Sequence, residues 1–369
     1  MRSTTGKNLK ITVWGGSHEP AIGVDITGLP QGTRIDMEKL AAFLRRRAPG
    51  SSPFATARKE PDIPVPTGGV SSGSPAVVTG ETVSFEIRNT DTRSSDYRAL
   101  RSVPRPGHAD FTARMRYSPH LNMSGGGPFS ARMTAPLCIA GGIAMQILES
   151  RGVTIGAHIY SIGDIRDDEL DTLSPDPQLA AALKKKDMAV ISDKAGTAMK
   201  EAILRAKAEQ DSLGGIVEVW ASGLPPGIGG AMYDGLESFL APLFFGIPAV
   251  KGVEFGAGFA ASRMKGSENN DPFYFDGDTV KTRTNNHGGI LGGITSGMPV
   301  TARIAFKPTP SISREQDSVD LDRRENTRLI IKGRHDPCVA VRAVPVTEAA
   351  MALGILDCIM EVKNDTAES

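Results

Sequence analysis

The chain repeats part of its own pattern, and this internal duplication constrains the fold more than any other feature of the sequence. The segment Val24–Gly32, a predicted strand that ends in a Gly/Pro turn, is echoed by Val219–Gly227. An amphipathic helical pattern follows each copy and includes Leu40–Leu44 in the first and Leu236–Leu240 in the second. We therefore expect two related units, each with a strand followed by a helix.

A second motif repeats in the same order along the chain. Gly68–Pro75 is echoed by Gly292–Pro299, and each copy leads into a strand pattern, Val83–Arg88 and Thr301–Phe306. Two motifs in the same order are unlikely to arise by chance, and the period is far too long for a solenoid. The duplication thus predicts two halves that pack together as one body.

The predicted boundaries follow from this pattern. We expect a single domain over residues 1–362, with halves at about 9–150 and 211–362. Residues 160–190 are the most polar part of the chain and predict an exposed excursion from the core. Residues 363–369 predict a frayed tail.

Three further helices are predicted outside the repeated motifs. Ala131–Glu149 is apolar and rich in alanine, so we expect a buried central helix there. Lys194–Gln210 and Glu348–Glu361 have the spacing of amphipathic helices. Strands and helices do not alternate regularly, which predicts an α+β fold or a layered β-α-β arrangement.

Composition is that of a soluble globular protein. Hydrophobic residues make up 40% of 369 positions, and no apolar stretch approaches the roughly 20 residues of a membrane span. The nearest candidate, Ala135–Leu148, is interrupted by glycines and Gln146, and the polar start Met1–Lys10 lacks a signal segment. The three cysteines are too scattered for a disulfide framework. We expect a cytoplasmic protein with no membrane partner.

The charge of the chain is balanced overall but uneven along its length. The 42 basic and 42 acidic side chains cancel, which argues against a nucleic-acid partner. Residues 1–140 nevertheless hold 18 Lys and Arg against 11 Asp and Glu, so that the net charge is +7 there and −7 in the rest. Arginine dominates the basic set, which fits either a site for a small anion or a solvated basic face.

Four of the six histidines lie in Gly/Pro-rich loops beside charged or polar groups. They are His18, His108, His287 and His335. Catalytic groups concentrate in loops on a rigid scaffold, and histidine is the side chain that titrates near neutrality. These loops favour an enzyme.

Two specific site patterns are incomplete. Ser17 and His18 are adjacent, but no glycine elbow surrounds the serine, so they do not predict a nucleophile–base pair. His335, Asp336 and Cys338 match no metal-ligand spacing, and we expect no metal site.

A dinucleotide-binding oxidoreductase is a remote alternative. Val250–Phe255 predicts a strand, Gly256–Ala261 resembles the G-x-G-x-x-A fingerprint, and Asp276 follows at about the right distance. The polar loop Ser267–Pro272, however, stands where that fold requires a helix and a second strand.

Glycine-rich loops suggest a phosphorylated ligand, or two. Ser124–Arg132 contains three consecutive glycines and opens into a predicted helix, whose N-terminus favours an anion. Gly288–Gly293 and Lys307–Ser311 are further segments where backbone could approach a ligand closely.

Taken together, these segments resemble the chorismate synthase family in order over nearly the whole chain. The two most specific motifs are RPGHAD and GRHDP. The matching segments are Arg45–Gly50, Arg58–Asp62, Asn89–Tyr97, Arg105–Asp110, Gly125–Arg132, Asp211–Gly215, Gly288–Gly297, Lys307–Ser311 and Gly333–Pro337.

The resemblance implies a carbon–oxygen lyase of the shikimate pathway, which serves aromatic amino acid biosynthesis. Its reaction is the trans-1,4-elimination of phosphate from 5-enolpyruvylshikimate 3-phosphate, giving chorismate. It implies reduced FMN as cofactor, with NADPH as one conceivable reductant. It also implies a homotetramer with a layered β-α-β core, in agreement with the duplication.

The resemblance also implies roles for individual residues. His18 would protonate the departing phosphate, and His108 would assist the reduced flavin. Asp336 and Ser17 would relay the proton from the flavin. The arginines that would clamp phosphate and carboxylates are Arg46, Arg47, Arg105 and Arg132. The residues that would line FMN are Ser130, Ala249, Gly292, Lys307, Pro308, Thr309, Ser311 and Arg334.

Four positions depart from the family pattern. The family reads Gly-Glu-Ser-His-Gly where this chain has Gly16 and Glu19 in place of the glutamate and the second glycine. Ser124 replaces an arginine before the triple glycine, and Pro128 replaces a basic or polar residue after it. A cation and a backbone donor are lost, which predicts weaker FMN or substrate binding. The alternative to an active enzyme is therefore a binding or scaffold homologue with reduced or lost turnover.

Overall fold

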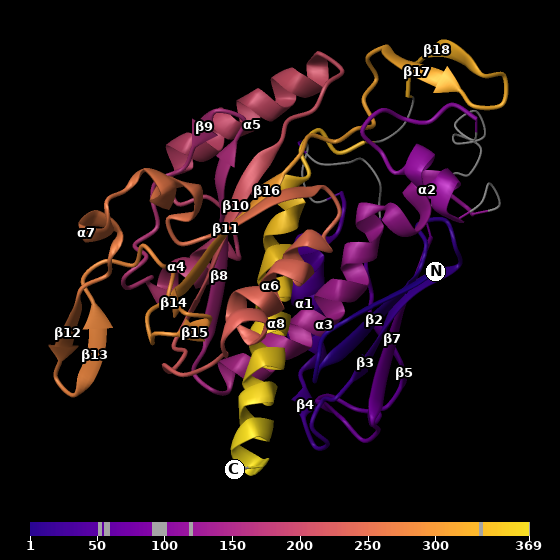
Figure 1. Cartoon of the computed structure of the whole chain (residues 1–369). Helices are drawn as coiled ribbons and strands as arrows, with labels where there is room; N and C mark the ends of the chain where they lie inside the picture. Colours follow the sequence, from indigo (N-terminus) through magenta and orange to yellow (C-terminus); the bar gives the residue numbers. More distant parts are fainter. Residues whose placement is uncertain (51–53, 55–59, 91–101, 118–120, 332–334, 369) are drawn as a thin grey trace.

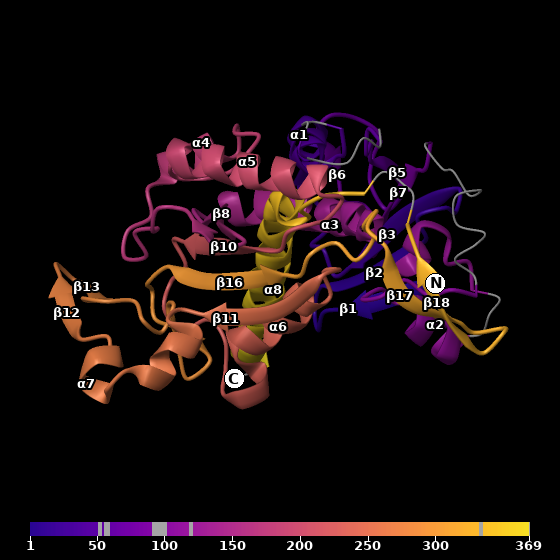
Figure 2. The ribbon, with the colours of Figure 1, turned by 90° about the horizontal axis from the view of Figure 1, so that it is seen from above.

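The fold is a sandwich of two antiparallel sheets with helices between them. The computed structural model describes residues 1–50, 54, 60–90, 102–117, 121–331 and 335–368, without the side chains of 362–368. The N-terminal sheet lies on one side of the long C-terminal helix and the second sheet on the other (Figures 1 and 2). The predicted layered β-α-β arrangement of the α+β class is confirmed.

The first sheet has five strands in the order β1-β2-β3-β7-β5. In β7, Val83, Phe85 and Ile87 are buried and alternate with more exposed residues, as expected of a strand with one face against a core. Val24 of β3 lies opposite Phe85 in the antiparallel register. The strands are β1 (Arg2–Thr5), β2 (Lys10–Gly15), β3 (Ala21–Thr27), β5 (Val65–Gly68) and β7 (Thr82–Arg88).

The second sheet also has five strands, in the order β11-β16-β10-β8-β9. Strand β8 is buried along almost its whole length, because α8 packs on it and α4 contacts it as well. The strands are β8 (Thr154–Ile162), β9 (Ile165–Arg166), β10 (Gly215–Ser222), β11 (Val250–Phe255) and β16 (Val300–Phe306).

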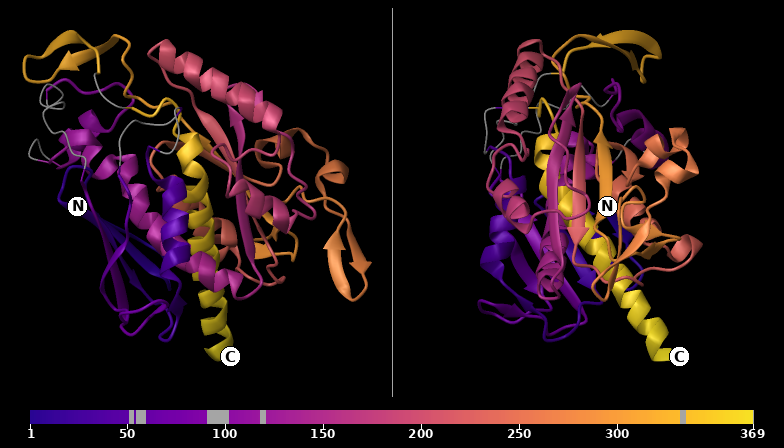
Figure 3. Two further views of the ribbon diagram at one scale, coloured as in Figure 1. Left: turned by 180° about the vertical axis from the view of Figure 1, so that it is seen from behind. Right: turned by 90° about the vertical axis from the view of Figure 1, so that its left-hand side faces the viewer.

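Four helices make up the middle layer: α1 (Met37–Arg47), α3 (Thr134–Glu149), α6 (Leu236–Phe245) and α8 (Ala340–Glu368). Helix α3 packs on the first sheet, α8 packs on the second, and the two helices pack against each other. Figure 3 shows α8 running between the two sheets. The apolar stretch that predicted a buried central helix is therefore α3, preceded by a 3₁₀ turn at Ala131–Met133.

The two halves repeat the same order of elements. In the first half, β3 pairs with β2 on one side and with β7 on the other, and α1 follows β3 in the chain. In the second half, β10 takes the place of β3: it pairs with β8 and with β16, and α6 follows it. The turns that end β3 and β10 also match. Gly28 and Gly223 both have positive φ, and a Cβ on either would clash with a backbone oxygen, Asn8 O at 2.2 Å or Gly152 O at 2.3 Å.

Smaller elements surround this sandwich. They are β4 (Arg34–Ile35), β6 (Ala76–Val77), β12 (Phe273–Asp276), β13 (Thr279–Thr282), β14 (Ile290–Leu291), β15 (Ile294–Thr295), β17 (Gln316–Asp320), β18 (Glu325–Leu329), α2 (Asp110–Tyr117), α4 (Pro177–Leu183), α5 (Asp193–Ala208) and α7 (Gly266–Asn269).

Two further segments contain regular elements and buried side chains or continue a helix. Residues 160–190 include the end of β8 and helix α4, and Leu170, Leu183 and Met188 are buried. The polar side chains that suggested an excursion alternate with these apolar ones, which pack into the core. Helix α8 runs from Ala340 to Glu368 and contains Pro345.

Among the residues that the structure describes, two helical segments are long and apolar enough to span a membrane, Ala131–Glu149 and Ala340–Glu361. The second was missed in the sequence, because the helix was expected to begin only at Glu348. They are 78% and 89% buried within the fold, as the core helices of a soluble protein are.

The dinucleotide-binding alternative is wrong. Strand β11 is an edge strand antiparallel to β16, whereas the dinucleotide fingerprint follows a parallel strand. The glycines after β11 lead into a 3₁₀ turn at Gly258–Arg263, the short helix α7 and the hairpin β12–β13.

Candidate active site

A cavity of about 970 Å³ lies where the two halves meet. This volume is at the upper end of the range of small-molecule sites, about 300–1,000 Å³, and gives room for a large ligand or for two. The wall comes from both halves of the chain, through side chains that lie within the segments 1–5, 11–18, 105–109, 125–134, 242–251, 307–311 and 335–342 without using every residue of them.

His18 reaches the cavity from the turn between β2 and β3. Its Nδ1 lies 3.2 Å from Ser17 Oγ, and that hydroxyl donates to the carbonyl of Ser124 at 3.0 Å. The serine oxygen therefore accepts from Nδ1–H of His18, so that Nδ1 is the ring nitrogen that faces the serine. Ser17 is fully buried, and its hydroxyl orients the imidazole of His18 through this contact with Nδ1.

The triple glycine Gly125–Gly127 gives space to both cavity histidines. All three residues have positive φ, at 61°, 93° and 52°. A Cβ on Gly125 would lie 2.1 Å from Cε1 of His18, and a Cβ on Gly126 would lie 3.2 Å from Nε2 of His108. The two imidazoles thus meet the same turn, and glycine is required for the first of these contacts.

His108 is held by an arginine–aspartate pair from its own loop. Arg105 donates to Asp110 through Nε at 2.6 Å and through NH2 at 2.7 Å. Nδ1 of His108 lies 2.8 Å from Asp110 Oδ1, so the imidazole donates to the carboxylate there and turns Nε2 toward Gly126. Burial alone would raise the pKa of Asp110, but the bonds from Arg105 and His108 hold it well below its usual value.

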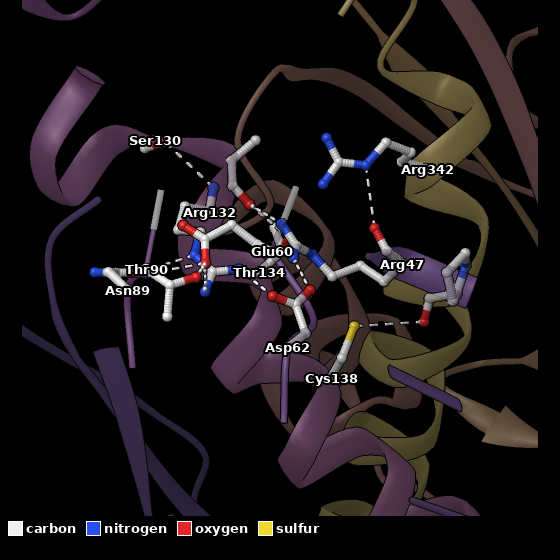
Figure 4. A network of polar contacts seen from close by, with 12 residues as sticks. Arg47, Glu60, Asp62, Asn89, Thr90, Ser130, Arg132, Thr134, Cys138 and Arg342 are labelled. Carbon is white, nitrogen blue, oxygen red and sulfur yellow. Dashed lines mark hydrogen bonds and ion pairs between the residues drawn. The ribbon is translucent and has the colours of Figure 1, made fainter. Parts of the chain in front are cut away.

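A second buried network joins Arg47 and Arg132 (Figure 4). Both guanidinium groups donate to the carboxylate of Asp62, and Arg47 Nε also donates to Thr134 Oγ1 at 3.0 Å. Glu60 lies 3.6 Å from Arg132 NH2. Burial would raise the pKa of Asp62, but the two arginines keep it below its usual value. Among the described residues, Arg132 NH2 has no hydrogen-bond partner.

The carboxylates that pair with these arginines had no predicted role. Each of the four predicted clamp arginines has one, because a buried guanidinium is stable only when paired. The pairs are Arg46 with Glu348, Arg47 and Arg132 with Asp62, and Arg105 with Asp110. Three of the four arginines line the cavity, whereas Arg46 does not.

His335, Asp336 and Arg342 form a further part of the wall. Asp336 accepts from Arg342 NH1 at 2.7 Å, and Arg342 Nε donates to the carbonyl of Arg47 at 3.1 Å. Burial, together with nearby Arg105, lowers the pKa of His335 to about 4, so this imidazole is neutral near pH 7. Arg342 had no sequence signal, since it lies in the first turns of α8, ahead of the predicted helix start.

A loop after β16 supplies polar groups to the same cavity. Lys307 Nζ donates to the carbonyl of Gly107, and Ser311 Oγ accepts from Arg105 NH1 at 3.2 Å. Within the described part of the chain, the buried Thr309 Oγ1 has no hydrogen-bond partner. Burial and the neighbouring cation of Lys251 both lower the pKa of Lys307. The two cations Lys251 and Lys307 make this part of the wall electropositive, and among the described residues the Thr309 hydroxyl there has no partner.

A family sequence model for chorismate synthase matches residues 9–360. The chain belongs to the chorismate synthase family. A chorismate synthase from Lancefieldella parvula is 41% identical over 371 residues, which cover 97% of this chain and 96% of the relative. One from Pyrococcus abyssi is 43% identical over 355 residues, covering 96% and 97%. The function is that of a chorismate synthase, a carbon–oxygen lyase of the shikimate pathway.

The fold agrees with this family. A solved crystal structure of a chorismate synthase matches with a TM-score of 0.74, covering 97% of this chain and 93% of that one. At 24% identity, this likeness shows the fold alone.

Several residues to which the family resemblance gives a role lie elsewhere. Gly292 is in the tight β14–β15 turn and does not line the cavity, nor does Pro308, although its neighbours Lys307 and Thr309 do. Arg334 lies outside the described residues. Ser130 and Ala249 do line the cavity.

Two of the positions that depart from the expected motif lie against each other. A Cβ on Gly16 would lie 3.1 Å from Oε1 of Glu19, so the glutamate side chain covers Gly16. Ser124 contributes its backbone carbonyl to Ser17, which any residue could do. The ring of Pro128 lines the cavity.

Proposed function

We propose that this chain converts 5-enolpyruvylshikimate 3-phosphate to chorismate with reduced FMN as cofactor. The observation that carries the proposal is the meeting of His18 and His108 at the triple glycine, inside a cavity whose wall includes Arg47, Arg105 and Arg132. Expelling phosphate needs a proton donor and cationic stabilisation, and these side chains supply both.

The wall fits a flavin mononucleotide. Thr309 Oγ1 is a buried hydroxyl without a partner among the described residues, next to the cation of Lys307, and Ser130 and Ala249 lie on the same cavity. We assign these four residues and Ser311 to the cofactor. When bound there, reduced FMN would supply electron density to the breaking C–O bond and an acceptor for the C6 hydrogen.

The chain's own residues bind the substrate and move protons. His18 gives its Nε2 proton to the departing phosphate, because its Nδ1–H is already used on Ser17. Arg132 binds an anionic group through its NH2, which has no hydrogen-bond partner within the described part of the chain. Asp336, fixed by Arg342, accepts a proton at the cavity wall, and His108 is held by Asp110 so that its Nε2 faces the ligand.

We further propose a homotetramer in the cytoplasm, with the small-molecule substrate and no nucleic acid or membrane as partner. The family supports the tetramer. All three cysteines, Cys138, Cys338 and Cys358, are buried free thiols, which suits a reducing compartment.

Anaerobic incubation with reduced FMN and 5-enolpyruvylshikimate 3-phosphate tests the function. We expect equal amounts of chorismate and inorganic phosphate to form. If the protein binds both ligands but releases neither product at saturating FMN, it is the scaffold homologue that Ser124 and Pro128 make conceivable. Omitting FMN is the matched control.

The affinity for FMN is expected to fall as pH rises above neutrality. Lys307 binds an anion only when protonated, and its lowered pKa brings the loss of that proton closer to neutral pH. The FMN phosphate itself is fully ionised above pH about 7, since its second pKa is about 6. Fluorescence titration of oxidised FMN between pH 7 and pH 9.5 measures the dissociation constant.

Two variants control this prediction. In Lys307→Arg the guanidinium stays charged, so the dissociation constant should no longer depend on pH in this range. In Lys251→Gln one cause of the lowered pKa is gone, so the loss of affinity should move to higher pH. The same pH dependence in all three proteins would exclude Lys307 as its source.

A further inference from the structure

Asn89 connects two parts of the cavity wall that are far apart in the sequence. It is the first residue after β7, and its side-chain Nδ2 donates to the carbonyls of Gly16 at 3.1 Å and Glu19 at 2.7 Å. Its Oδ1 accepts from Arg132 Nε at 3.0 Å (Figure 4). Nitrogen must face the carbonyls and oxygen the guanidinium, because the reverse orientation would lose all three bonds.

The two carbonyls lie on either side of the proton donor. Gly16 and Glu19 flank Ser17 and His18, and Glu19 N donates back to Gly16 O at 3.0 Å to close the turn. The amide of Asn89 therefore donates hydrogen bonds to both ends of the turn that carries the His18 imidazole.

The third bond fixes the orientation of a guanidinium. Arg132 uses Nε on Asn89 and NH1 on Asp62, so that its plane is defined by two partners. NH2 is the nitrogen without a hydrogen bond among the described residues, and these two bonds decide where it points.

We propose that Asn89 is a positioning residue that keeps the turn of His18 and the guanidinium of Arg132 in a fixed relation. The inference rests on the function proposed above for those two side chains. One planar amide spans both, so a displacement of either is transmitted to the other.

The side chain is not needed to hold the sheet together. The backbone N–H of Asn89 donates to the carbonyl of Pro20 at 3.0 Å, and β3 pairs with β7 from Ala21 opposite Arg88 to Thr27 opposite Thr82. Changing the side chain leaves these backbone bonds in place, so variants should fold.

Two substitutions separate the two ends of the amide. Asn89→Asp keeps the acceptor for Arg132 but puts a carboxylate oxygen against the two carbonyls. We expect kcat to fall by about 10- to 100-fold, because proton transfer needs accurate placement, with KM within about twofold of wild type. Asn89→Ala loses both ends, and we expect the same fall in kcat with a KM raised about fivefold or more.

A control variant and a binding measurement complete the test. Asn285 also bridges two carbonyls, Thr172 O at 2.9 Å and Pro299 O at 2.8 Å, but does not line the cavity. Asn285→Asp should lower the melting temperature and leave kcat and KM unchanged. Calorimetric titration with 5-enolpyruvylshikimate 3-phosphate should give a raised dissociation constant in Asn89→Ala and not in Asn89→Asp.

Three results would overturn the inference. The first is a kcat within twofold of wild type in Asn89→Asp. The second is the same change of kcat and of KM in both Asn89 variants. The third is a loss of activity in the Asn89 variants that Asn285→Asp also shows at an equal loss of melting temperature. If wild type makes no chorismate, the proposed function fails, and the coupling is judged on the dissociation constants alone. Equal constants in both variants would then reject it.

Discussion

Replacing Gly125 by alanine is expected to lower kcat by about 10²- to 10⁴-fold, the range that general acid–base catalysis contributes to enzymatic rates. The added Cβ would lie 2.1 Å from Cε1 of His18 and 2.4 Å from its Nδ1. Neither the glycine backbone nor the imidazole can keep its place, so the hydrogen bond from His18 to Ser17 is lost. Steady-state chorismate formation with reduced FMN measures the effect.

Gly277→Ala is the matched control for this substitution. Gly277 has the same φ as Gly125, 61°, but a Cβ on it would meet nothing within 4 Å. Both variants carry the left-handed backbone cost of about 1–2 kcal/mol, and only Gly125→Ala displaces His18. If the two proteins lose equal melting temperature and kcat stays within tenfold of wild type in both, the steric role of Gly125 is refuted.

The sequence predicted the triple glycine as an anion-binding loop that opens a helix. The structure gives Gly125 and Gly126 a more specific use, since each faces the ring of a histidine distant in the sequence. Periodicity and turn chemistry reveal elements and loops, which is why the two repeated strands, their helices and the central helix α3 were predictable. The contact between His18 and Gly125 depends on how the loops meet, and no pattern in the sequence predicted it.

The least predictable part of the site is what pairs with its charges. A count of arginines predicted an excess of positive charge, but Asp62, Asp110 and Glu348 neutralise much of it by pairing at close range. Glu348 lies about 300 positions from Arg46 in the chain, and no local pattern joins them. Burial explains these pairs, and burial is a property of the folded sandwich.

Replacing His158 by alanine is expected to lower the free energy of unfolding by about 3–5 kcal/mol, the usual cost of removing one partner from a buried charged pair. His158 is fully buried in β8, with Nδ1 2.8 Å from Asp167 Oδ2 and Nε2 3.0 Å from Glu218 Oε2. Without the imidazole, Asp167 keeps the N–H groups of Ile191 and Ser192, and Glu218 keeps Arg303 at 2.7 Å. Both carboxylates nevertheless lose the cation between them.

The pH dependence distinguishes this charge effect from a simple cavity. Burial would lower the pKa of His158, but Asp167 and Glu218 raise it above 6.5, so its contribution is complete below pH 6.5 and is lost as pH rises through the raised value. Burial would likewise raise the pKa of each carboxylate, but the bonds from His158 lower the pKa of both. The contribution of each carboxylate to the stability is therefore present above its ordinary pKa, at pH above 3.8 for Asp167 and above 4.5 for Glu218, and is lost at lower pH.

The difference in stability between wild type and His158→Ala should therefore be largest between about pH 4.5 and pH 6.5 and shrink on either side. Urea denaturation at a series of pH values measures it. None of these three side chains lines the cavity, so kcat at a permissive temperature should stay close to wild type. Ile159→Ala, in the same buried strand, removes a comparable volume without a charge, and its loss of stability should not vary with pH. A flat profile for His158→Ala as well would mean that the imidazole stabilises the sheet by filling space and not by its charge.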